Sequence, residues 1–244
     1  MPKSKCKNAI LVFESPWNLD NYDANRSSVL PFVQGVAKMQ GDTEVFFQNF
    51  HNKSSFKFAL ECLCRQKFNN TIVYIAAHGS KDRIGKVSIE DLLAAVNEKS
   101  REYNIKGLML GSCFAGTKTD LLQIYTEGSN LRWSAGYSSS CDWLIGTMID
   151  CAIIHSALNI EDEQYKTHEA MQKVFAGAIA SFASNAIIGE NRKQKSVPLS
   201  DSLQFVIQPE GRGFRAQVSS PKVFEQAEEH RLNEDVEEEL EEAL

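Results

Sequence analysis

Two short apolar segments each lead to a side chain that could take part in nucleophilic catalysis. Residues 71–77 are followed by His78 and Gly79, and residues 107–110 are followed by Gly-Ser and then Cys113. A thiol nucleophile needs a nearby general base, and histidine is the side chain that most often serves. The chain therefore holds both residue types that a covalent thiol mechanism requires.

The pattern around these residues predicts that they lie close together. Short continuous apolar runs are typical of strands buried on both faces of a parallel sheet. The carboxyl ends of such strands open at one edge, where α/β proteins place their chemistry. Gly79 would let the backbone approach a substrate, and its N–H could help to hold an oxyanion. A helix beginning after Cys113 would favour the thiolate.

The rest of the chain alternates between strand and helix patterns. The expected strands are 7–13, 43–47, 71–77, 105–110, 131–135, 203–207 and 213–218, the last two forming a hairpin, with room for a smaller hairpin in 80–87. The expected helices are 29–39, 55–65, 88–97, one from about 119, 141–158 and 161–188. This order predicts an α/β fold with a mostly parallel central sheet flanked by helices and a C-terminal helical and hairpin extension.

Composition limits the classes of partner. The net charge of the 244 residues is −6, but residues 221–244 hold ten acids against two basic residues, so residues 1–220 carry +2. We therefore expect a domain over 1–220 and an acidic tail over 221–244, which is a helix or a disordered segment outside the core. No basic cluster indicates nucleic-acid binding.

The cysteines and apolar runs indicate the compartment. The six cysteines show no paired C-x-x-C spacing, so neither a zinc site nor another metal site is expected, and no cofactor is needed. No run is long enough for a signal peptide or a membrane span. The expectation is a soluble cytoplasmic protein with free thiols and no membrane partner.

The order of these motifs resembles a known clan. The apolar strand before His78-Gly79 and the strand before Gly-Ser-Cys113-Phe-Ala-Gly are similar to the caspase, legumain and metacaspase clan of cysteine peptidases, including its CHAT-type members. In that clan the histidine follows the third strand and the cysteine follows the fourth, on a caspase–haemoglobinase fold. The resemblance implies that His78 is the general base and Cys113 the nucleophile, and that the N–H groups of Gly79 and Cys113 form the oxyanion hole.

The same resemblance implies a substrate pocket. In the clan, the strand after the nucleophile lines the pocket for the residue that precedes the scissile bond. Ser134 and Gly136 are small enough to leave such a slot open. An acidic residue at the bottom of the pocket would select arginine or lysine. Asp142, Asp20 and Asp23 are the acidic candidates. Asp142 is equally well placed to cap the helix that follows it.

Three other features have simpler interpretations. Residues 111–119 resemble a phosphate-binding loop, but Thr117 stands where the lysine should be and Lys118 is displaced by one position. Cys151 and His155 lie four residues apart on an apolar helix, which is too few ligands for a metal. Every fourth residue from Val236 to Leu244 is apolar, which indicates a weak partner-binding face on the tail.

The predicted activity is cleavage of protein substrates through a Cys-His dyad, with cutting after basic residues as the expected preference. By resemblance, the protein is a regulated effector, as in antiviral defence, which an activating ligand or partner protein switches on. A protein, a cyclic nucleotide and self-cleavage all stay open as that signal. The alternatives are a catalytically idle interaction module of the same fold and, less favoured, a nucleotide-binding protein.

Overall fold

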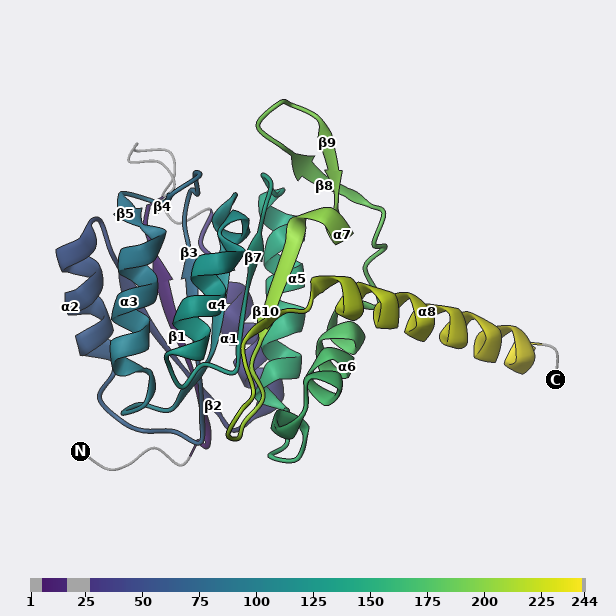
Figure 1. Ribbon diagram of the computed structural model, residues 1–244, viewed down its shortest axis with the longest axis horizontal. Coiled ribbons are helices and arrows are strands. Elements are labelled where there is room, and N and C mark those ends of the chain that lie inside the picture. The colour runs from purple at the N-terminus through teal and green to yellow at the C-terminus, as the bar shows by residue number, and fades with distance from the viewer. Residues whose placement is uncertain (1–5, 17–26, 243–244) are drawn as a thin grey trace.

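The computed structural model describes residues 6–16 and 27–242, with side chains up to residue 232, and shows a seven-stranded sheet in the order β11-β10-β7-β6-β3-β1-β2 (Figure 1). The five strands from β7 to β2 are parallel, and β10 and β11 are antiparallel to their neighbours. The strands of the sheet are β1 Asn8–Glu14, β2 Thr43–Asn49, β3 Asn70–Ala76, β6 Ile105–Gly111, β7 Trp133–Tyr137, β10 Leu203–Ile207 and β11 Gln217–Val218. This arrangement confirms the predicted α/β fold.

Helices cover both faces of the sheet (Figure 1). They are α1 Leu30–Gln40, α2 Lys53–Leu63, α3 Ile89–Ser100, α4 Thr119–Glu127, α5 Trp143–Leu158, α6 His168–Ile179, α7 Leu199–Ser202 and α8 Ser220–Glu242, with short 3₁₀ turns at Ala115–Thr117 and Gln164–Lys166. Buried side chains of α1, α5, α6 and α8 pack on one face, and those of α2, α3 and α4 pack on the other. Alternate residues of a strand point to opposite faces, so the central strands are apolar throughout.

The start of α1 is held by an acid at the end of β1. The buried carboxylate of Glu14 accepts hydrogen bonds from the backbone N–H of Val29, at 2.5 Å, and from the Ser28 hydroxyl, at 2.9 Å. Burial raises the pKa of this carboxyl, while the two donors act in the opposite direction. The contact fixes Val29 at the edge of the sheet where β1 ends.

The single long helix predicted over 161–188 is wrong. Thr167 accepts from the Ala170 N–H and starts α6, which ends at Ile179, and the chain then enters a separate hairpin of β8 Ile187–Glu190 and β9 Ser196–Pro198. Apolar residues at helical spacing continue past the helix, although most of residues 181–187 are exposed. The smaller hairpin expected in 80–87 is present as β4 Arg83–Ile84 and β5 Val87–Ser88.

The C-terminal part closes the sheet and then leaves it. The hairpin predicted from 203–207 and 213–218 is present, although β11 spans only two residues. The helix α8 runs on to Glu242 and extends away from the body (Figure 1). The acidic tail was expected to lie outside the core. The first turns of α8 instead belong to the core, because Val223, Phe224 and Ala227 are buried. The division at residue 220 stays a prediction, and Val236, Leu240 and Leu244 lie outside the described side chains.

Candidate active site

The two candidate catalytic residues leave neighbouring parallel strands at the same level. Ala76 of β3 is paired with Gly111 of β6, and His78 and Cys113 each follow two residues later. The chains then touch through their backbones, because a Cβ added to Gly79 would lie 1.9 Å from the carbonyl oxygen of Cys113. No other residue type fits at position 79 without moving one of the two loops.

The backbone of Gly79 is oriented by a bridge to the next loop. The Gly85 N–H donates to the His78 carbonyl at 2.7 Å, and the Ser80 N–H donates to the Arg83 carbonyl at 2.8 Å. In this antiparallel bridge Gly79 lies opposite Ile84, and the two residues exchange no hydrogen bonds with each other. The N–H of Gly79 therefore points away from Ile84. The orientation agrees with the role expected of Gly79 as an oxyanion donor.

A buried serine ties the two strand ends together. The hydroxyl of Ser112 accepts from the Ala77 N–H at 3.2 Å, and the Ser112 N–H donates to the Leu110 carbonyl at 2.8 Å. The first of these bonds joins the residue before His78 to the residue before Cys113. Sequence reasoning missed this link, although a small hydroxyl residue directly before Cys113 was a visible signal.

Cys113 is half-buried, and its thiol lies 4.0 Å from the Cys141 carbonyl oxygen, to which it donates. The next residue, Phe114, has a φ of 62°, and its N–H donates to the Ser139 carbonyl at 2.9 Å. This left-handed residue turns the chain sharply, and only a three-residue 3₁₀ turn follows before α4. The helix expected from about residue 119 is present as α4, but it begins six residues after Cys113, so the thiol is not on its first turn.

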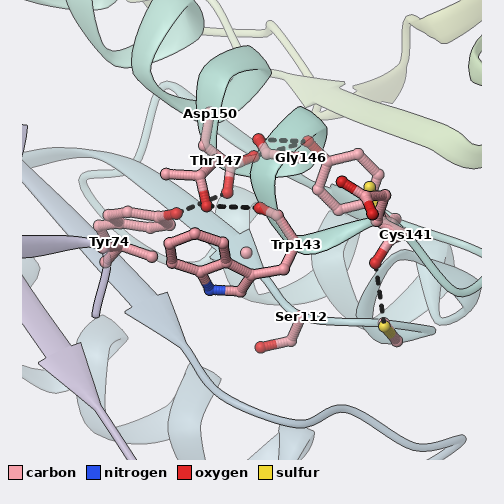
Figure 2. A pocket seen from close by; sticks show the side chains of 12 residues that line it. Tyr74, Ser112, Cys141, Trp143, Gly146, Thr147 and Asp150 are labelled. Carbon is pink, nitrogen blue, oxygen red and sulfur yellow. Dashed lines mark hydrogen bonds between the residues drawn. The ribbon is translucent and has the colours of Figure 1, made fainter. Parts of the chain in front are cut away.

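A narrow pocket opens beside Cys113. Its lining also includes Gly111, Tyr74, Trp143 and Asp150, with contributions from β3, β6, β7 and α5. Figure 2 shows the side chains of Tyr74 and Asp150 pointing toward each other, with the Trp143 ring beside them. His78 is not part of this lining; it is exposed in the loop after β3.

The pocket contains a buried carboxylate. Asp150 is 2% exposed and accepts from the hydroxyls of Tyr74 and Tyr137, each at 2.7 Å. Burial raises the pKa of Asp150 to about 7, although the two tyrosine hydroxyls act to lower it. A Cβ on Gly111 would lie 2.5 Å from the Asp150 carboxylate, so the glycine leaves the acid open to the pocket.

Trp143 forms another wall. Its ring meets Phe32 edge-on, with centroids 5.7 Å apart. Its indole nitrogen is buried and has no hydrogen-bond partner within 6–16 and 27–242. A buried donor without an acceptor costs free energy, so a ligand that brings an oxygen to this nitrogen would gain a favourable contact.

The structure separates the three residues predicted to bind substrate. Asp142 lines the pocket at its rim, and its carboxylate accepts from the N–H groups of Leu144 and Ile145, which caps α5. Ser134 is fully buried against the hydroxyl of Thr126, at 3.1 Å. Gly136 is buried beside Gly116, and neither it nor Ser134 lines the pocket.

Asp150 was not a candidate in the sequence analysis. Its only signal was its position as the one carboxylate within the apolar helix that follows the predicted pocket strand. The other acidic candidates, Asp20 and Asp23, lie outside the described residues.

The residues of the alternative motifs have ordinary structural surroundings. Lys118 pairs with Asp82 at 3.0 Å rather than facing an empty loop. Burial raises the pKa of Cys151 to about 12, and the Nδ1 of His155 lies 2.9 Å from the Gln40 amide. Among the residues that the structure describes, no group of three or more His, Cys, Asp or Glu side chains could hold a metal ion.

Comparison with solved structures finds a similar fold in a cysteine protease. The match is the X-ray structure of a secreted C11 cysteine protease from Bacteroides thetaiotaomicron in complex with an irreversible peptide inhibitor, with a TM-score of 0.53 and 10% sequence identity. The alignment covers 83% of this chain and 66% of that chain, slightly under two thirds of the protease. No protein-family model matches the sequence, and no curated protein matches it.

This likeness supports the caspase-like fold that the motifs indicated. At 10% identity the likeness concerns the architecture alone. Within the described part of the chain, no helix has the length and apolar character that a membrane crossing requires.

Proposed function

We propose that this protein is a cysteine endopeptidase in which Cys113 is the nucleophile and His78 the general base. The observation that carries the proposal is the backbone contact between Gly79 and Cys113, which brings the two strand ends to one point of the sheet edge. The similar fold of a cysteine protease supports it.

The reaction follows from the groups at this edge. His78 takes the thiol proton, and the thiolate attacks the carbonyl carbon of the scissile peptide bond. The N–H groups of Gly79 and Cys113 hold the oxyanion, the amine leaves with the proton from His78, and a thioester remains on Cys113. Water, deprotonated by His78, then hydrolyses the thioester and restores the thiol. No cofactor takes part in these steps.

The pocket beside Cys113 supports a preference for a basic residue before the cut. A cationic side chain entering it would approach Asp150, whose carboxylate is buried and therefore interacts strongly with a charge. In this proposal Asp150 takes the place at the pocket base that was expected of Asp142, which the cap of α5 already occupies.

The test is cleavage of a peptide library with mapping of the new chain ends. Wild-type protein should cut after arginine or lysine, and Cys113→Ala and His78→Ala should each lower the rate by at least about a thousandfold. Asp150→Asn should weaken the preference for a basic residue over leucine by about tenfold or more. Cys151→Ala is the matched control, because Cys151 is also half-buried, and should cut normally.

Two outcomes would overturn the proposal. Undiminished cleavage by Cys113→Ala would exclude Cys113 as the nucleophile. Slow alkylation of Cys113 by iodoacetamide, no faster than that of Cys62 and unchanged in His78→Ala, together with no cleavage, would favour the idle module. Activation by a ligand or partner, a defence role and a cytoplasmic location stay predictions, and the similar protease is described as secreted.

A further inference from the structure

The hairpin β8–β9 is fastened beside the candidate active site. The Ser140 N–H donates to the Glu190 carbonyl at 2.9 Å, and the Asp142 N–H donates to the Ile188 carbonyl at 2.9 Å. A Cβ on Gly189 would lie 2.0 Å from the Ser140 carbonyl oxygen, so the two segments are in close contact. The hairpin is thus joined to the loop that also lines the pocket.

The tip of this hairpin reaches the nucleophile loop. Asn191 shapes the tip, because its side chain accepts from the N–H groups of Lys193 and Lys195 at 2.8 and 3.2 Å. The guanidinium of Arg192 lies 5.3 Å from the ring centroid of Phe114, the residue after Cys113. The tip therefore lies next to the residue that follows the candidate nucleophile.

Positive charge from three segments gathers at this place. Lys118 pairs with Asp82 at 3.0 Å, and Lys118, Lys81 and Arg192 all act to lower the pKa of the Asp82 carboxyl. We call Lys81, Lys118, Arg192, Lys193 and Lys195 the cationic rim; it comes from the loop after His78, the loop after Cys113 and the hairpin tip.

Lys193 and Lys195 leave part of the positive charge of the rim unpaired. Within 6–16 and 27–232, neither Lys193 nor Lys195 forms an ion pair, and Asp82 is already engaged by Lys118. A patch of one sign beside a binding site raises the local concentration of ligands of the opposite sign.

From this charge distribution we infer that the cationic rim selects substrates whose cleavage site is flanked by acidic residues. This rests on the proposed peptidase function. The buried acid of the pocket and the exposed cations of the rim would bind side chains of opposite charge. A single basic residue of the substrate enters the pocket, and the substrate residues on either side of it carry negative charge. Polybasic segments would be repelled by the rim although their side chains fit the pocket.

The experiment compares peptides of equal length with one arginine, flanked on both sides by glutamate, glutamine or lysine. We expect kcat/KM to fall in that order, by about three- to tenfold per step at low salt, mainly through KM. The difference should shrink strongly in about 0.5 M salt, because exposed charges are screened.

The decisive variant reverses the two unpaired lysines. Lys193→Glu with Lys195→Glu should invert the order of the peptides, mainly through KM. The control is Lys67→Glu with Arg101→Glu, which makes the same charge change at exposed positions near the opposite edge of the sheet, before β3 and β6. The control should keep the wild-type order.

Failure of this inference and failure of the proposed function give different results. Equal cleavage of all three peptides would overturn the inferred role of the cationic rim. So would a change in the order of the peptides that is the same in both double variants. If no peptide is cut, fluorescence anisotropy with Cys113→Ala measures binding instead. Tighter binding of the glutamate peptide, lost in Lys193→Glu with Lys195→Glu, then supports the rim while the peptidase assignment fails.

Discussion

At the scale of single residues, Asp150 has the most unusual chemistry in the described part of the molecule. The Tyr137 hydroxyl contacts both the Asp150 carboxylate, at 2.7 Å, and the Gly146 carbonyl, at 3.1 Å, but it has only one proton to donate. When Asp150 is protonated it donates to Tyr137, which then donates to Gly146. When Asp150 is ionised, the Tyr137 hydroxyl donates to the carboxylate and no longer to the Gly146 carbonyl.

This arrangement predicts a pH dependence of stability. The pKa of Asp150 is about 7 in the folded protein and 3.8 in the reference state, so the folded protein binds this proton more tightly. The contribution of Asp150 to the free energy of unfolding is therefore largest below about pH 4. It falls by at most about 1.4 kcal/mol per pH unit up to about pH 7 and then levels off.

Urea unfolding between about pH 5 and pH 8 measures this effect. The stability of wild type should fall with rising pH relative to Asp150→Asn, which keeps the shape but has no titrating proton. Parallel stability curves for the two proteins would show that Asp150 is ionised throughout this range.

At the scale of elements, the segments that follow β3 and β6 are joined to each other. Their backbones touch at Gly79 and Cys113, and the Ser112 hydroxyl bonds across them. Reacting groups that are misplaced by an ångström lose much of their rate, so the proposed reaction would depend on this backbone contact.

Gly79→Ala tests that contact. The new methyl group would start 1.9 Å from the Cys113 carbonyl oxygen, so one loop must move, and we expect cleavage to fall by about a hundredfold or more. Gly177→Ala is the matched control: Gly177 lies within α6 with no atom within 4 Å of the added methyl group. It should keep full activity and raise the unfolding free energy by about 0.5–1 kcal/mol. Full activity of Gly79→Ala would show that the loops are not held by this contact.

The elements also show what the sequence could predict. The strands around His78 and Cys113 were recognisable because buried parallel strands are continuously apolar. The hairpin of β8 and β9 was missed because residues 180–188 continue the apolar spacing of α6, whereas the extended form of β8 depends on hydrogen bonds from Ser140 and Asp142 to Glu190 and Ile188. Asp150 was missed because helical periodicity gives a direction around the axis but not the neighbour that a side chain meets.

At the scale of the whole molecule, α8 fastens the antiparallel end of the sheet. The Phe205 N–H donates to the hydroxyl of Ser220, at 2.8 Å, and Val223 and Phe224 pack into the core cluster that also holds α6. The segment that the sequence marked mainly by its acidity therefore begins as part of the core.

Phe224→Ala should lower the unfolding free energy by about 3 kcal/mol, because it removes a ring that is 7% exposed. Leu232→Ala, on the same helix but 60% exposed, should change it by less than about 0.5 kcal/mol. Chemical denaturation of both variants checks the contrast. Equal and small effects would show that α8 contributes nothing to the stability of the sheet.

The fastening of the β8–β9 hairpin to a loop outside the sheet has a consequence for how such a protein can diversify. The groups proposed to break the bond directly follow two buried strands, whereas three of the five residues of the cationic rim lie at the tip of this hairpin. Substitutions at these few surface positions would therefore change the proposed preference for acidic flanks without touching the strands that carry the proposed dyad.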